Sequence, residues 1–534
     1  MNLNETFNKL KQKSIFPKIF FFLSLFLVIF VRLRLLSMPL DRDEGAWAYE
    51  GWLLLNGIPP FTYFYDAKMV GTYYLYAFFM MLFGQTIEGV RIGILFTILI
   101  NMFLIYAVSK KISGNSDSGM LACSFYALFS LDYGTLALSG YTTHFVLTFI
   151  MLSVIFLLDA LKKENAFLFF LSGMFAGCSF CVKQPAVFFI ILFLVYILVV
   201  MYLRKTMVKK IIKNALSFIA GAAAVFLVIC LIMKNYGVFD KFWFMTITFA
   251  MSHGQQLSLN NLFYIFSFFI REYGIFLKVT LILTVLYCFF VIFYIKETEK
   301  KFLYVTLFVS SVLFCLSGFY LRPHYFIIFS LPAALFLSEK FYDSKNKPVI
   351  SRKLNNFFYV LLLFLLLFTQ NDVLFKLSPD QVSRKIFRNN PFPESIEIAK
   401  FIKNNTKDTD RIVIIGSEPQ ILFYAKRKSA TGYVCFNQMM DVSKIADEMQ
   451  IEAIKEIEQS NPAYLVFVNI YDSLGMYGGS STRIFEWLKS TTKNLKLSGI
   501  VNIISLDRTD YVWGPQAEKY QLQSNSWIAV FKFK

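Results

Sequence analysis

The first two thirds of the chain alternate between long apolar stretches and short polar stretches that are rich in lysine. A helix needs roughly 20 apolar residues to cross the hydrocarbon core of a bilayer. About eleven stretches meet that requirement. Their approximate limits are 15–36, 90–108, 118–138, 141–160, 165–182, 184–203, 214–233, 273–295, 302–320, 323–339 and 354–371. This pattern predicts a polytopic α-helical membrane protein.

Basic residues indicate how these spans are oriented, because cytoplasmic loops accumulate Lys and Arg. Alternate loops are basic, and they are the ones that carry Lys110, Lys162, Lys209, Lys300 and Lys345. We therefore expect these loops and the N-terminus on the cytoplasmic side of the plasma (inner) membrane. An odd number of spans then places the segment after about residue 372 outside. The first stretch has a basic flank but no small-residue cleavage site, so we expect a retained span.

Two regions outside the spans, one between the first two spans and one after the last, differ from the spans in composition. Residues 37–89 form a long outer loop, and within it Met69 to Phe83 is apolar but too short to cross comfortably, which predicts an interfacial helix. Residues 373–534 change in composition, with more charge and shorter apolar runs. We expect strands at 411–416, 463–469 and 527–533 and helices at 394–404, 442–459 and 481–491. The predicted organisation is a transmembrane module over 1–372 and an extracytoplasmic α/β domain over 373–534.

The composition agrees with a membrane location and gives no support to other classes of protein. The chain of 534 residues is 57% hydrophobic, with a mean hydropathy of +0.55. Its formal charge of +18 is partly a consequence of the basic cytoplasmic loops, so it gives no support to nucleic-acid binding. Cys435 is the single cysteine of the C-terminal domain, which excludes a disulfide within that domain.

The most informative polar cluster follows the first apolar stretch. Asp41, Arg42, Asp43 and Glu44 stand at the mouth of a span, where ionisable groups are costly and indicate a site. A solvated loop is the plain alternative for this cluster. A second alternative is an Asp-x-Asp motif that holds a metal-bound nucleotide sugar, but that arrangement belongs on a soluble nucleotide-binding fold. Downstream, Tyr49, Asp66, Lys68 and Arg91 complete the polar pattern of the loop.

Taken whole, the segment from MPLDRDEGAWAYEGW to EGVRIG resembles the corresponding region of the GT-C membrane glycosyltransferases. The similarity is to the bacterial branch related to protein O-mannosyltransferases and to the aminoarabinose transferase that modifies lipid A. It extends through LSGMFAGCSFCVKQPA (171–186), RPHYFIIFSLP (322–332) and RIVIIGSEPQILFYAKRKSATGY (411–433). The resemblance implies a GT-C fold and a polyprenyl-phosphate-linked sugar donor used on the outer face.

Several roles follow from this resemblance alone. Asp43 matches the catalytic Asp of the family, Glu44 its neighbour, Lys68 the loop lysine that contacts the lipid phosphate, and Arg91 the arginine that opens the next span. The chain departs from the family in two places. Met69 follows Lys68 where Pro is frequent, and Tyr141 to His144, with Asp132 nearby, stand where many relatives carry an acidic residue.

The residue types suit glycosyl transfer from a lipid phosphate, which needs a base for the proton of the acceptor and cations for the departing phosphate. Asp43, with Glu44 beside it, is the expected catalytic centre. For the donor phosphate we expect Lys68, Arg91, Lys183, Arg322 and His324, with Arg32 a further candidate. Contacts with the sugar or acceptor are assigned to Asp41, Tyr49, Asp66, His144 and His253. Interfacial anchoring is the competing interpretation for Lys183, Arg322 and His324.

These expectations define a glycosyltransferase that moves a hexose or pentose to a lipid, glycan or protein acceptor. Single displacement with one carboxylate as base would invert the anomeric centre, by analogy with glycosidases. No cofactor is required, and a divalent metal is compatible with the residues. A lipid-sugar flippase is the first rival, although repeated halves and broken midplane helices are not evident. An envelope polysaccharide polymerase or ligase and a non-catalytic envelope subunit are the others.

Overall fold

The computed structural model describes residues 15–254, 274–319, 321–342 and 348–534. The chain divides into two compact units. The transmembrane unit comprises Met1–Arg34, Ile94–Ile229 and Leu257–Lys376. The loop–domain unit comprises Leu35–Gly93, Cys230–Gln256 and Leu377–Lys534, so the first long loop groups with the C-terminal domain rather than with the spans that flank it in sequence.

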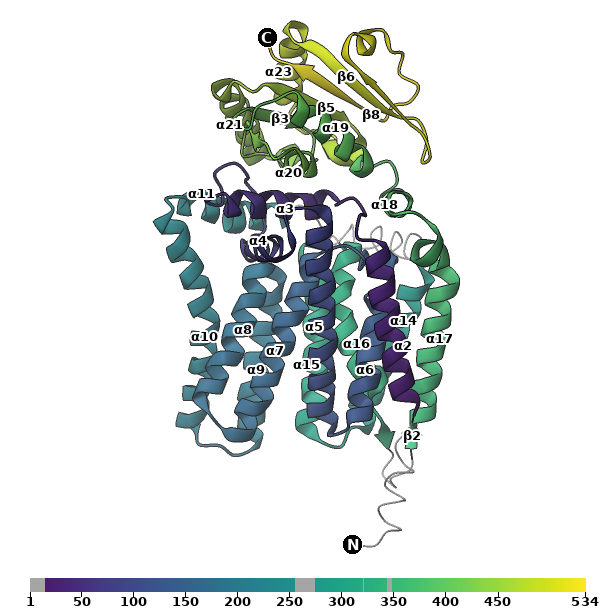
Figure 1. The fold of residues 1–534 in the computed structure, drawn as a ribbon. Coiled ribbons are helices and arrows are strands. Elements are labelled where there is room, and N and C mark those ends of the chain that lie inside the picture. The colour runs from purple at the N-terminus through teal and green to yellow at the C-terminus, as the bar shows by residue number, and fades with distance from the viewer. Residues whose placement is uncertain (1–14, 255–273, 320, 343–347) are drawn as a thin grey trace. The chain divides into compact units, whose positions relative to one another are not determined.

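Helices overlap all eleven predicted apolar stretches, although not every one of these helices is long enough to be a span. They are α2 (Phe16–Arg34), α5 (Ile87–Ser113), α6 (Ser116–Phe129), α7 (Thr142–Lys163), α8 (Ala166–Val182), α9 (Val187–Leu203), α10 (Val208–Asn235), α14 (Ile275–Tyr294), α15 (Thr298–Leu316), η5 (Pro323–Phe329) with α16 (Ser330–Ser338), and α17 (Arg352–Asn371). Within the described residues, seven helices are long and apolar enough to cross a membrane. Figure 1 shows α7, α8, α9 and α15 side by side. The polytopic helical fold is therefore confirmed.

One predicted stretch is longer than its helix. The apolar run 118–138 was expected as a single span, but α6 ends at Phe129. Asp132 then caps a short 3-10 turn, η1 (Tyr133–Thr135), by accepting hydrogen bonds from the backbone N–H groups of Gly134 and Thr135. Leu136 follows with a φ of 58°, a left-handed conformation that no helix continues. An Asp side chain that bonds to its local backbone favours a turn over a helix.

Glycines bring α8 and α10 into close contact. A Cβ added to Gly173 would lie 1.9 Å from the Phe218 carbonyl oxygen, and one added to Gly221 would lie 2.0 Å from the Phe170 oxygen. Gly177, one turn beyond Gly173, has the same relation to Ala222. Small residues at this spacing let the backbones of membrane helices approach one another.

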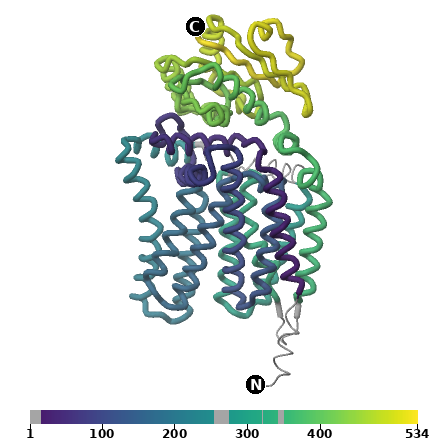
Figure 2. Tube along the Cα trace, viewed as in Figure 1, coloured from purple at the N-terminus to yellow at the C-terminus, as the bar shows by residue number. Residues whose placement is uncertain are grey.

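The C-terminal domain contains a six-stranded sheet of order β4-β3-β5-β8-β6-β7. Its strands are β3 (Arg411–Ile415), β4 (Lys428–Ser429), β5 (Tyr464–Asn469), β6 (Lys496–Ile503), β7 (Thr509–Trp513) and β8 (Trp527–Lys532). β3 pairs in parallel with β4 and β5, and the remaining pairs are antiparallel. Figure 2 shows that the last strands in sequence, in yellow, lie on the side of the domain away from β3.

Six helices accompany this sheet. They are α18 (Pro379–Phe387), α19 (Phe392–Asn404), α20 (Gln420–Ala425), α21 (Lys444–Ser460), α22 (Tyr471–Leu474) and α23 (Arg483–Thr491). The three strands and three helices expected from the sequence are confirmed. β6 and β7 were not expected, because a bulge between Leu497 and Gly499 interrupts the apolar pattern of β6 and β7 is only half buried.

The loops of the loop–domain unit are helical and pack on its C-terminal part. They carry α3 (Arg42–Leu55), α4 (Gly71–Phe83), α11 (Phe239–Trp243), the π-helical η3 (Phe244–Phe249) and α12 (Ala250–Gly254). The predicted apolar helix at Met69 to Phe83 forms as α4, and its interfacial location stays a prediction. Tyr65 and Lys241 contact the C-terminal domain, since the Tyr65 hydroxyl donates to Glu456 and Lys241 forms an ion pair with Glu452 at 2.7 Å.

We predict that Gly173→Ala lowers the thermal stability of the purified protein. The added methyl group meets a backbone oxygen that cannot rotate away, so α8 and α10 must separate, at a cost of about 1–3 kcal/mol. The melting temperature in detergent measures the effect. Gly478→Ala is the matched control, because nothing lies within 4 Å of a Cβ at that position. Equal melting temperatures for the two variants would contradict the close helix contact.

Candidate active site

The N-terminus of α3 is fixed by its own side chains. Asp41 is the N-cap residue, and its Oδ1 accepts a hydrogen bond from the Glu44 backbone N–H at 2.9 Å. Glu44 Oε2 in turn accepts one from the Asp41 N–H at 3.2 Å. This capping box satisfies two backbone donors that a helix start leaves without partners. Asp43 therefore lies on a well-defined first turn.

Glu44 and Arg91 form a buried ion pair. Both Glu44 oxygens accept hydrogen bonds from the Arg91 guanidinium, at 2.6 and 2.9 Å, and the two side chains are 0% and 5% exposed. Arg91 also donates to the carbonyl oxygens of Met38 and Pro39 at the start of the loop. A bidentate pair of this kind holds the two segments in a defined geometry. The pair thus ties the beginning of α5 to the turn that leads into α3.

Asp43 and Lys68 form a second ion pair that remains partly exposed. Their charged groups lie 2.5 Å apart, with side-chain exposures of 29% for Asp43 and 35% for Lys68. The Lys68 ammonium also lies 5.0 Å from the centre of the Trp47 ring. Burial would lower the pKa of Lys68, but the carboxylates of Asp43 and Asp66 outweigh it and raise the pKa, so the lysine stays cationic.

Tyr49 and Asp66, which were assigned to substrate contacts, are buried and hydrogen bonded within the loop–domain unit. The Tyr49 hydroxyl accepts from the Ser429 backbone N–H at 2.8 Å. Asp66 accepts from Gln438 at 2.8 Å and from the Tyr73 hydroxyl at 3.3 Å. Both side chains join the first loop to other parts of its unit, and their role toward a substrate stays a prediction.

A cationic and aromatic cluster lies in the transmembrane unit. Lys183, which follows α8, lies 3.9 Å from the centre of the Tyr325 ring and 3.5 Å from the Thr143 hydroxyl. The His324 ring is stacked on Tyr141 with their centres 4.1 Å apart. Arg322 precedes the same η5 helix and is exposed. Lys183 and His324 both lie beside the Tyr325 ring, and their assignment to the donor phosphate stays a prediction.

His144 and Arg32 contact the turn between α6 and α7. The His144 ring nitrogen Nε2 lies 3.0 Å from the Ala137 carbonyl oxygen, and the side chain is fully buried. Arg32 donates to the carbonyl oxygens of Ser130 and Ala137, both at 2.8 Å. These contacts satisfy backbone oxygens of an irregular segment, which a membrane protein must do internally.

His253 falls in α12, and its side chain lies outside what the structure describes. Within the described part of the chain, no group of three or more His, Cys, Asp and Glu side chains lies close enough to hold a metal ion.

Glu50 is a buried carboxyl that the sequence analysis did not single out. It lies on α3 seven residues after Asp43, a spacing that puts both on one side of the helix. The side chain is 1% exposed, and its carboxyl group lies near the Phe61 backbone and Asp66. Burial, with a further contribution from Asp66, raises the pKa of Glu50 well above its usual 4.5. The helical spacing from Asp43 was the available sequence signal.

We predict that Glu50→Gln stabilises the protein more at pH 8 than at pH 4. Below about 4.5 the carboxyl is protonated in both states, and as the pH rises the unfolded state ionises first, so the wild type loses stability up to the folded-state pKa. The amide cannot ionise and removes that loss, roughly 1–3 kcal/mol at pH 8. Melting temperatures across pH measure it, with exposed Glu518→Gln as control. The same gain at both pH values would contradict a neutral Glu50.

Comparison with known proteins finds one family match and several similar solved structures. Residues 68–234 match the family described as dolichyl-phosphate-mannose-protein mannosyltransferase. Among curated proteins, the sequence comparison finds no significant relative.

Solved structures resemble the chain over most of its length. ArnT from Cupriavidus metallidurans bound to undecaprenyl phosphate matches with a TM-score of 0.57 and 13% identity, over 97% of this chain and 98% of that one. The Archaeoglobus fulgidus oligosaccharyltransferase tethered to an acceptor peptide matches with a TM-score of 0.51 and 10% identity, over 94% of this chain and 74% of that one. The chain shares the fold of these structures, which confirms the GT-C fold expected from the sequence.

Proposed function

We propose that this protein is a membrane glycosyltransferase that moves a monosaccharide from a polyprenyl-phosphate donor to a hydroxyl group of a lipid, glycan or protein. The observation that carries the proposal is the partly exposed Asp43–Lys68 pair on the first turn of α3, in a chain with the GT-C fold. The undecaprenyl phosphate bound to the structurally similar ArnT supports the donor class.

Asp43 is the proposed base. The acceptor oxygen attacks the anomeric carbon and loses its proton to the Asp43 carboxylate, while the bond from that carbon to the donor phosphate breaks. The polyprenyl phosphate leaves with one more negative charge, and the anomeric centre is inverted by this single displacement. Lys68 holds the Asp43 carboxylate in place through their ion pair.

Cations are proposed to stabilise the negative charge of the donor phosphate. Lys183, Arg322 and His324 are the phosphate ligands proposed in the transmembrane unit. Lys68 is the phosphate ligand proposed in the loop–domain unit. The donor phosphate is anionic before transfer and gains further negative charge as it leaves, so cations bind it in both states. Tyr325 favours this role for Lys183, since an ammonium over an aromatic ring is held in place without being neutralised.

The buried groups are proposed to support this chemistry indirectly. Glu44, Arg91 and Asp41 hold the first turn of α3, and we assign them to positioning Asp43 rather than to contact with the donor. The distribution of basic loops supports the proposed orientation, with the N-terminus in the cytoplasm and the C-terminal domain outside the plasma membrane.

Asp43→Asn is expected to abolish transfer while leaving the fold intact, because the amide has nearly the shape of the carboxylate but cannot take a proton. The assay follows label from a panel of synthetic polyprenyl-phosphate sugars into membrane extracts, with equal amounts of each purified variant. Exposed Asp507→Asn is the control and should transfer at the wild-type rate. Wild-type protein that binds the lipid-linked sugars but transfers none of them would overturn the proposal in favour of transport.

Lys183→Ala is expected to raise the KM for the donor about tenfold with a smaller change in kcat, because it removes one charge-assisted contact to the phosphate. Kinetics at varied donor concentration separate the two constants. Lys205→Ala, at an exposed lysine of the same unit, serves as control. A wild-type KM in Lys183→Ala would leave interfacial anchoring as the explanation of this lysine.

A further inference from the structure

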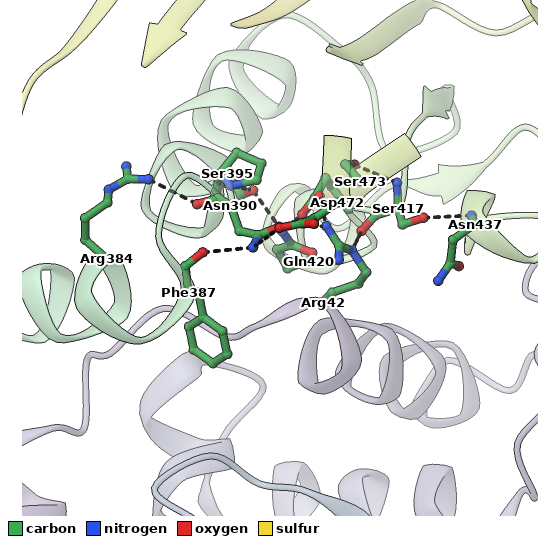
Figure 3. Close-up of polar contacts among 12 residues, drawn as sticks. Arg42, Arg384, Phe387, Asn390, Ser395, Ser417, Gln420, Asn437, Asp472 and Ser473 are labelled. Carbon is green, nitrogen blue, oxygen red and sulfur yellow. Dashed lines mark hydrogen bonds and ion pairs between the residues drawn. The ribbon is translucent and has the colours of Figure 1, made fainter. Parts of the chain in front are cut away.

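Arg42, the first residue of α3, is bound by loops of the C-terminal domain (Figure 3). Its guanidinium donates to the Ser417 carbonyl oxygen at 2.5 Å, to the Glu418 carboxylate at 2.7 Å and to the Asn390 side-chain oxygen at 3.0 Å. Three acceptors therefore converge on the side chain that directly precedes the proposed base, Asp43.

The acceptors of Arg42 are themselves fixed. Ser417 follows strand β3, and its backbone N–H donates to the carbonyl oxygen and the hydroxyl of Ser473, which follows β5. Glu418 is 0% exposed, and its second oxygen accepts from Gln420 at 2.6 Å. A buried carboxylate that lost its arginine would be an uncompensated charge, which is costly. The contact is thus anchored at the carboxyl ends of two parallel strands.

Electrostatics keep Arg42 charged in this setting. Burial alone would lower its pKa, but Glu418, Asp43 and Asp472 outweigh that effect and raise it. Asp472 lies on the far side of Asn390, whose side-chain nitrogen is 3.4 Å from the Asp472 carboxylate. The groups around Arg42 are therefore predominantly acidic, and a neutral replacement would remove the cation that pairs with Glu418.

The same side of α3 touches the C-terminal domain along its length. Gly45, one turn after Arg42, faces Gln420 so closely that an added Cβ would lie 2.6 Å from the Gln420 Cβ and 2.8 Å from its backbone nitrogen. Tyr49, a further turn along, accepts from the Ser429 N–H. Residues at these spacings share one helix face. Asp43 lies about 100° further round the helix axis, on the side that Lys68 approaches.

We propose that Arg42 is a positioning residue through which the Ser417–Gln420 loop of the C-terminal domain sets the place of Asp43. This inference rests on the proposed function of Asp43 as the base. It assigns the C-terminal domain a direct part in the reaction, since one helix face is bound by that domain while the adjacent face presents the carboxylate. Displacing a base by 1 Å can cost about a hundredfold in rate, so a lost anchor at the adjacent residue should be visible in kinetics.

The test compares full-length wild type with Arg42→Ala, Arg42→Lys, Glu418→Gln and the double variant Arg42→Ala/Glu418→Gln in the transfer assay. We expect Arg42→Ala to lower kcat about 10- to 100-fold with the donor KM within about twofold, and Arg42→Lys to recover part of the loss. Glu418→Gln should lower kcat as well, and the double variant should be no worse than Arg42→Ala, because both remove one interaction. Arg483→Ala, which breaks an exposed ion pair with Asp447, should leave kcat unchanged.

Several results would overturn the positioning role. They are a wild-type kcat in Arg42→Ala, a loss of activity in Arg42→Ala that matches the loss of folded protein, and additive losses of kcat in the double variant.

A labelling experiment separates this proposal from the proposed function. Asp43→Cys is treated with a water-soluble maleimide with and without Arg42→Ala, and the described native cysteines are buried or half buried. Faster labelling of Asp43→Cys/Arg42→Ala than of Asp43→Cys supports the positioning role, even if the protein transfers sugar from none of the lipid-linked donors. Equal labelling rates overturn it.

Discussion

The buried ion pair between Glu44 and Arg91 is the interaction on which the candidate active site depends. Two charges withdrawn from water carry a desolvation cost that only close, bidentate geometry offsets. Arg91 meets that condition by also donating to the carbonyl oxygens of Met38 and Pro39, so the pair fixes the chain on both sides of the α3 capping box. Such a pair provides a defined geometry, and here it fixes the first turn of α3, which carries Asp43.

Around this anchor the loop–domain unit is assembled from distant parts of the sequence. Tyr65 of the first loop and Lys241 of the second both contact the α21 helix of the C-terminal domain. Gly432 lies against the Tyr65 ring so closely that a Cβ would be 2.3 Å from it. The first two outer loops, which the sequence analysis places in the transmembrane module over 1–372, therefore belong to the same compact unit as the C-terminal sheet.

Sequence patterns predicted the parts of the structure that depend on local periodicity. Apolar runs located the helices of the transmembrane unit, and buried strands such as β3 and β5 followed from β-branched stretches. Partners across the chain could not be predicted in this way. Glu44 was assigned to chemistry and Arg91 to phosphate binding, whereas the pairing of the two is a tertiary contact that no local pattern encodes. Glu50 was missed because its burial depends on how α3 packs.

The spacing of contacts along the chain has a consequence for biosynthesis. Arg91 follows Glu44 by 47 residues, so that pair can form soon after the first loop emerges. Glu418 follows Arg42 by 376 residues, which at ordinary translation speeds is a delay of roughly 20 to 75 seconds. Throughout that interval the ribosome holds a nascent chain whose α3 lacks its C-terminal partner. The Arg42–Glu418 contact therefore cannot form before the whole transmembrane unit and the start of the C-terminal domain have been synthesised.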